Sequence, residues 1–194
     1  MNNFKNLTLA IVASLGMVGV ANADALSYDY VGAGVSYLNL DSGSADSFGA
    51  FVNGSKSIND NLFVFGSYSY DHNDNVDIGI NQVRAGVGGR FSVSNSTDLY
   101  GTVYGFYGSS IYDFDVRLAD TWGYGVETGV RSRFSDFELK VGVSHEQYTD
   151  FDFSDNYVVV GAAYHFTDSV AGTVDVRHTL DGSYHTTAGV RFSF

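Results

Sequence analysis

Histidine and aspartate are the residues of this chain best suited to acid–base chemistry, because an imidazole beside a carboxylate can transfer protons at neutral pH. The histidines with aspartates nearby in the sequence are His72, His145, His178 and His185. Aspartate is so common here that such proximity carries little weight, and no G-x-S-x-G motif accompanies it. We therefore predict no catalytic residues.

A calcium loop is a second chemical possibility. The 1-3-5-7 spacing of oxygen ligands is present in Asp71, Asn73, Asn75 and Asp77. However, Val76 stands where the tight turn requires glycine, and Gln82 stands where a bidentate glutamate is needed. We therefore predict neither a metal site nor a bound cofactor.

The elements that must position the polar side chains are strands, in which successive side chains point to opposite faces. Alternation between apolar and polar residues predicts strands at 26–40, 47–57, 62–72, 79–92, 98–109, 119–134, 137–149, 156–166, 170–179 and 184–194. The runs at 62–72 and 98–109 are less decisive, because aromatic residues occur on both faces. The chain contains no proline, which suits a sheet without free edges. We predict an all-β fold, a transmembrane antiparallel up-and-down barrel of ten strands, with eight as second choice.

Charged residues distinguish the two faces of these strands. A charge that faces lipid costs about 2–4 kcal/mol at the bilayer midplane, so charges in a membrane barrel should point into the lumen. The residues predicted to line the lumen are Arg84, Arg90, Glu127, Arg131, Arg133, Glu138, Lys140, Glu146, Asp175, Arg177 and Arg191. Most aspartates fall instead in or beside one set of connections.

Sequence patterns at the two ends of the chain predict targeting signals. Lys5, the apolar stretch 7–20 and the sequence Ala21-Asn22-Ala23 predict a signal peptide over residues 1–23, cleaved after Ala23. The barrel domain would then be 24–194. The final strand has an apolar and aromatic face that resembles a C-terminal assembly signal of outer-membrane barrels, and we assign that signal to Tyr184, Ala188, Val190, Phe192 and Phe194.

The connections between strands alternate in character. Short polar turns alternate with mostly longer, aspartate-rich loops, of which 110–118 is predicted to be the longest. Short periplasmic turns and longer external loops are the usual barrel asymmetry. With an even number of strands, both termini would be periplasmic.

The chain resembles the small outer-membrane β-barrels of Gram-negative bacteria, the group that includes OmpA- and OmpX-like barrels. The resemblance rests on the opening segment 26–31, the repeated hairpins and the closing segment 189–194. It implies a cell-envelope protein in contact with lipid and lipopolysaccharide, inserted by the barrel-assembly machinery. A periplasmic domain after Phe194 is not expected. The resemblance identifies an architecture rather than an activity.

The sequence leaves three classes of function open: a structural or surface-interaction protein, a channel and an enzyme. A lumen filled by ion pairs predicts a structural or surface-interaction protein, whose host or surface ligand the sequence does not identify. A narrow porin-like channel, selective for anions, is the alternative, and its space would come from inward glycines at 86, 88, 123, 125 and 129. An omptin-like or acyltransferase-like barrel enzyme is less favoured. A net charge of −12 argues against nucleic-acid binding.

Overall fold

The computed structural model of the protein describes residues 26–39, 46–112, 116–150, 153–180 and 182–194. The predicted signal peptide over residues 1–23, with its cleavage site at Ala23, lies outside the described residues. Within the described ranges, no helix has the length and apolar character needed to cross a membrane.

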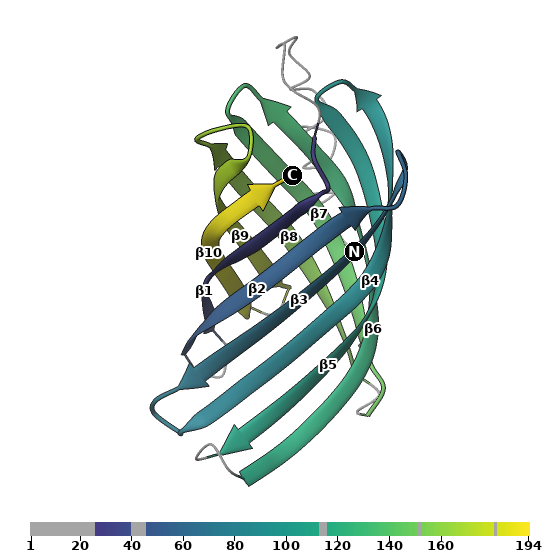
Figure 1. The fold of residues 1–194 in the computed structure, drawn as a ribbon. Helices are drawn as coiled ribbons and strands as arrows, with labels where there is room; N and C mark the ends of the chain where they lie inside the picture. Colours follow the sequence, from purple (N-terminus) through teal and green to yellow (C-terminus); the bar gives the residue numbers. More distant parts are fainter. Residues whose placement is uncertain (1–25, 40–45, 113–115, 151–152, 181) are drawn as a thin grey trace.

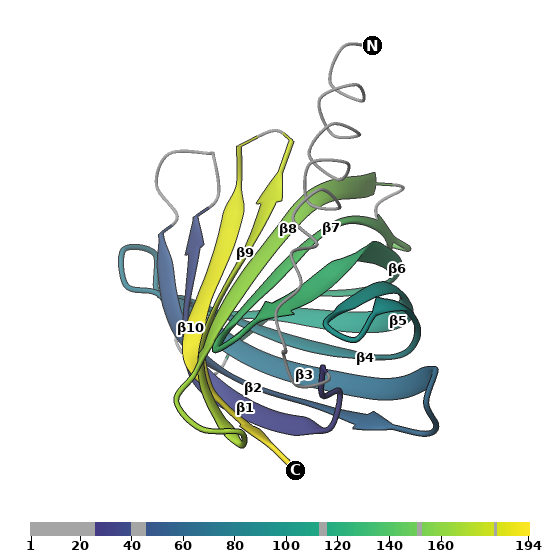
Figure 2. The same cartoon turned by 90° about the horizontal axis from the view of Figure 1, so that it is seen from above.

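The described chain forms a closed antiparallel barrel of ten strands, which confirms the predicted fold class and strand number. Each strand pairs with its neighbours in sequence, and the ring closes between the first and last strands, where Tyr30 pairs with Ser193. Figures 1 and 2 show the strands tilted and arranged in this ring order around the interior. The strands are β1 Tyr30–Asn39, β2 Ser47–Ser57, β3 Leu62–Asn73, β4 Ile78–Ser94, β5 Thr97–Tyr112, β6 Val116–Phe134, β7 Phe137–Tyr148, β8 Phe153–His165, β9 Val170–Thr179 and β10 Tyr184–Ser193.

Several predicted boundaries are wrong, among them the start of the eighth strand, which was predicted at 156 and lies at Phe153. The segment 110–118 was predicted to be a loop, but pairing continues to Tyr112 opposite Val116 and leaves 113–115 as the connection. A register shift after Ser110 lets the two strands continue past the polar residues that suggested a loop. The predicted first strand also begins too early, because the segment Leu26–Asp29 is not part of β1.

The outer surface of the barrel is apolar, as lipid requires. A row of valines crosses four neighbouring strands in register, where Val64 pairs with Val87, Val87 with Val103, and Val103 with Val126. All four side chains are exposed, Val103 to 58%. Phe192 and Phe194 of the C-terminal segment are likewise exposed on the outside. Alternation along each strand therefore turns the intervening side chains into the lumen.

Adjacent positions near the middle of β5 test this register. Val103 faces outward, whereas Thr102 lines the interior cavity. Val103→Arg should lower the free energy of unfolding by about 2–4 kcal/mol, because the guanidinium would face lipid. Thr102→Arg places the same side chain in a polar lumen and should cost clearly less. Urea titrations of both variants in the same lipid vesicles measure the difference, and equal losses would show that the register is wrong.

Candidate functional site: the charged lumen

Two spaces lie along the lumen of the barrel. We call the end that contains Tyr30, Ser193 and the turns 58–61, 95–96, 135–136 and 166–169 the terminal end, and the opposite one the loop end. A lumen cavity of about 280 Å³ lies towards the terminal end. A vestibule of about 360 Å³ lies towards the loop end. Charged side chains separate and bound these two spaces.

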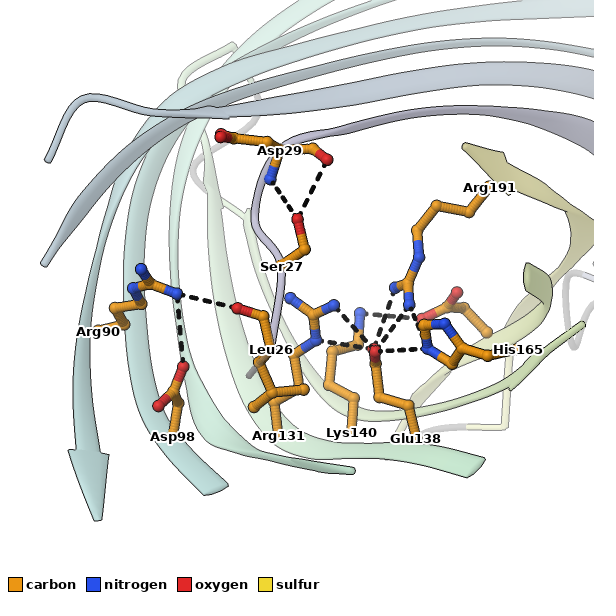
Figure 3. A network of polar contacts seen from close by, with 11 residues as sticks. Leu26, Ser27, Asp29, Arg90, Asp98, Arg131, Glu138, Lys140, His165 and Arg191 are labelled. Carbon is orange, nitrogen blue, oxygen red and sulfur yellow. Dashed lines mark hydrogen bonds and ion pairs between the residues drawn. The ribbon is translucent and has the colours of Figure 1, made fainter. Parts of the chain in front are cut away.

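Glu138 on β7 is the centre of the first charged cluster, near the terminal end. Arg131 from β6 donates through Nε to Oε1 at 2.7 Å and through Nη2 to Oε2 at 3.0 Å. Arg191 from β10 donates to the same two oxygens at 3.0 and 2.6 Å. His165 on β8 lies 3.3 Å from Oε2. Figure 3 shows these groups converging on the carboxylate, so one acid joins four strands.

Glu146, also on β7, is the centre of a second cluster between the lumen cavity and the vestibule. Its side chain is fully buried, at 0% exposure. Its Oε1 lies 2.8 Å from Nη2 of Arg177 and 3.2 Å from Nη2 of Arg84, and it accepts a hydrogen bond from the Tyr104 hydroxyl at 2.8 Å. Arg84 is on β4 and Arg177 on β9, with four strands between them in either direction around the ring. The two guanidinium groups therefore reach Glu146 from opposite walls.

Between the clusters, the lumen cavity is bounded by further polar pairs. Lys140 on β7 lies 2.9 Å from Oδ1 of Asp175 on β9. The Tyr100 hydroxyl donates to Glu127 at 2.9 Å. These four residues all line the cavity, so charges of both signs surround it.

Aromatic rings occupy the positions opposite inward glycines, and this explains why β3 and β5 carry aromatics on both faces. A Cβ atom added to Gly125 would lie 2.6–2.7 Å from atoms of the Tyr104 ring and hydroxyl. The glycines thus make room for these aromatic side chains. Similar contacts join Gly88 to Phe63, Gly123 to Phe106, and Gly129 and Gly142 to the Tyr100 hydroxyl.

The remaining predicted lumen charges lie close to the terminal end. Nε of Arg90 donates to the carbonyl of Asp60 at 2.7 Å, and its Nη1 is 3.9 Å from Asp98. Arg133 is buried and donates to the carbonyl of Ser135 at 3.0 Å. Neither residue lines the lumen cavity or the vestibule.

Three buried polar residues, Asp98, His165 and Asp71, take part in contacts inside the barrel that the sequence did not predict. Asp98 is 4% exposed. It lies two residues before the inward-facing Tyr100, so alternation along the strand could have placed it inside. Nothing in the sequence context of His165 indicates Glu138 as its partner. Asp71, considered above as a calcium ligand, instead accepts a hydrogen bond from Ser36 at 2.5 Å.

The calcium spacing does not form a calcium loop. The side chain of Asn73 accepts hydrogen bonds from the backbone N–H groups of Asn75 and Val76 and so caps the turn. Among the described residues, no group of three or more His, Cys, Asp or Glu side chains could hold a metal ion.

The histidines near the loop end have different partners from one another. His72 lies 3.4 and 3.5 Å from Asp74 and Asp77. His145 pairs with Asn156, His178 with the carbonyl of Ser183, and His185 lies 3.9 Å from Asp71. None of these contacts joins a histidine to a serine hydroxyl, so they do not assemble the proton relay of a serine hydrolase.

Comparison with known proteins agrees with this architecture. A family model described as the outer membrane protein beta-barrel domain matches residues 8–194. Neisserial surface protein A is 20% identical, with a TM-score of 0.50, and the match covers 87% of this chain and 98% of that one. The KdgM porin is 13% identical, with a TM-score of 0.46 and coverage of 88% and 87%. OprG from Pseudomonas aeruginosa is 12% identical, with a TM-score of 0.40 and coverage of 88% and 98%.

No curated protein sequence matches the chain. At the identities of the solved structures, the likeness concerns the fold, and the chemistry of the lumen has to be argued from this chain's own residues.

Loss of the central acid should destabilise the barrel. Glu146→Gln leaves two largely buried guanidinium groups, 16% and 14% exposed, without their counter-charge and should lower the free energy of unfolding by about 3–5 kcal/mol. Glu127→Gln is the matched control, because the amide oxygen can still accept from Tyr100, and its cost should be about 1 kcal/mol. Urea unfolding of both variants in lipid vesicles gives the two values. A Glu146→Gln loss no larger than that of the control would contradict this account.

Proposed function

Because this chain belongs to the outer membrane protein beta-barrel domain family, we propose that it is a non-enzymatic structural or surface-interaction protein whose lumen is closed. The observation that carries the proposal is the fully buried Glu146, bound by Arg84 and Arg177 from opposite walls. A solute crossing the lumen would have to separate these charges in a narrow interior. The cost of leaving a buried charge unpaired makes that passage unfavourable.

We propose the following placement in the outer membrane of a Gram-negative bacterium. The signal peptide over residues 1–23 directs export and is removed after Ala23, and both termini face the periplasm. The apolar outer face contacts lipid, and the loop end contacts lipopolysaccharide and the exterior. The loop-end turns carry exposed acids such as Asp74, whose side chain is 94% exposed, and these turns are the surface available to a partner.

A narrow channel for small anionic solutes is the second candidate. It is favoured by the lumen cavity of about 280 Å³ and the vestibule of about 360 Å³, which lie on the two sides of the Glu146 cluster. The excess of basic groups at this cluster, two guanidinium groups on one carboxylate, would favour anions. In this alternative, thermal opening of the cluster joins the two spaces.

Conductance of the refolded protein in planar bilayers separates the two candidates. A closed lumen predicts no steady conductance for residues 24–194, and none for Lys56→Ala, whose side chain is 60% exposed at the terminal end. Steady conductance of the wild type that changes on Arg84→Ala but not on Lys56→Ala would overturn the closed lumen and establish the channel.

The C-terminal strand is proposed as the signal for the barrel-assembly machinery. Phe194 is 69% exposed on the outside of the barrel, and its backbone N–H donates to the carbonyl of Asp29 at 3.1 Å. Deletion of Phe194 should therefore leave export intact but reduce the amount of heat-resistant barrel in outer-membrane fractions. Ser193→Ala, on the opposite face of the strand, is the control. Normal insertion of the deletion variant would remove Phe194 from the signal.

A further inference from the structure

The segment Leu26–Asp29 enters the lumen instead of extending β1. Leu26 and Tyr28 are 6% and 5% exposed, and they pack with Phe63 and Phe65 as the buried apolar cluster of the barrel. Figure 3 shows Leu26 and Ser27 inside the barrel, between Arg90 on one wall and the Glu138 cluster. The segment alternates like the start of a strand, but its apolar side chains lie in the interior of the barrel.

Asp29 fixes the point at which the chain turns inward. Its carboxylate accepts a hydrogen bond from the backbone N–H of Ser57, at the end of β2, and lies 3.2 Å from Nζ of Lys56. The hydrogen bond from Ser57 lowers the pKa of the Asp29 carboxyl. The Asp29 carbonyl accepts from Phe194 on the other side. The turn is thus attached to both strands that flank β1 in the ring.

Tyr28 occupies a socket formed by two guanidinium groups and an aromatic ring. Cζ of Arg90 lies 4.7 Å from the centroid of the Tyr28 ring, and Cζ of Arg131 lies 4.6 Å from it. The Phe63 ring centroid is 4.6 Å away. Cations over the faces of a desolvated ring attract it through its quadrupole. Nη1 of Arg90 also donates to the carbonyl of Leu26 at 3.1 Å, which holds the backbone as well as the ring.

From this geometry we propose that Leu26–Asp29 is an intramolecular plug that closes the terminal end of the lumen. The socket of Arg90, Arg131 and Phe63 binds the plug through its aromatic side chain. Arg131 both contacts Tyr28 and binds Glu138, so the plug is attached to the ion-paired cluster as well as to the wall. The lumen then has one open side, the vestibule, and solutes enter it from the loop end only.

The plug is separate from the Glu146 closure described under the proposed function. The Glu146 cluster lies towards the loop end, and its partners Arg84 and Arg177 are not part of the socket. A conducting wild-type protein would contradict closure at both places, whereas a silent one would not show which of the two closes the lumen. The test of the plug therefore measures access to Leu26 rather than conductance.

Thiol labelling can measure whether the segment is inside, because the chain has no cysteine of its own. Leu26→Cys and Ile58→Cys would be refolded in vesicles and exposed to a membrane-impermeant maleimide. Ile58 is the matched control, since it is 62% exposed in a turn at the same end of the barrel. The plug predicts labelling of Leu26→Cys at least about tenfold slower than that of Ile58→Cys, because it requires local opening. Equal rates would overturn the proposal.

Variants of Tyr28 test the socket in the Leu26→Cys background. Tyr28→Ala removes the ring and should raise the labelling rate about tenfold, whereas Tyr28→Phe keeps the ring and should retain slow labelling. If Tyr28→Ala does not fold, Arg90→Met tests the same contact from the wall and should also accelerate labelling. Labelling that stays slow in Tyr28→Ala or in Arg90→Met would show that the socket does not retain the segment.

Discussion

The whole structure depends on the cost of a charge without a partner inside a membrane-embedded barrel. The outer face is covered by apolar side chains such as the exposed valines of β3 to β6. Charged side chains in the membrane-spanning part of the barrel must therefore point into the lumen. Inside, they have to pair, because an uncompensated buried charge is strongly destabilising. Glu138 and Glu146 meet this demand by binding two guanidinium groups each. Pairing across the lumen stabilises the barrel, and under the proposed function it also closes the lumen.

Aromatic rings packed against glycines fill part of the lumen. The inward glycines of β6 and β7 receive the side chains of Tyr100, Tyr104 and Phe106, all from β5. Tyr100 and Tyr104 then place their hydroxyl groups on Glu127 and Glu146. One strand thus supplies both the apolar filling and the hydrogen-bond donors that complete the charged clusters. The plug uses the same chemistry at the terminal end, where Tyr28 lies between Arg90 and Arg131.

Much of this arrangement could be predicted from period-2 alternation, and the rest could not. Alternation gives the face of each side chain, so the number of strands and the outward position of Val87 follow from it. It gives no partner across the lumen, because Arg84 and Arg177 meet at Glu146 through ring closure and strand tilt. Alternation also predicted a strand at Leu26–Asp29, where the chain instead turns inward at Asp29. Its absence predicted a loop at 110–118, where polar residues remain paired between strands.

The central claim is that Glu146 on β7 binds guanidinium groups across the lumen, and a double-mutant cycle between Glu146 and Arg177 on β9 tests it most directly. Unfolding free energies of the wild type, Glu146→Gln, Arg177→Gln and the double variant would be measured in one lipid. A direct buried pair predicts a coupling free energy of at least about 1 kcal/mol, so the double variant should lose less than the sum of the single losses. Losses that add to within about 0.5 kcal/mol would contradict the account.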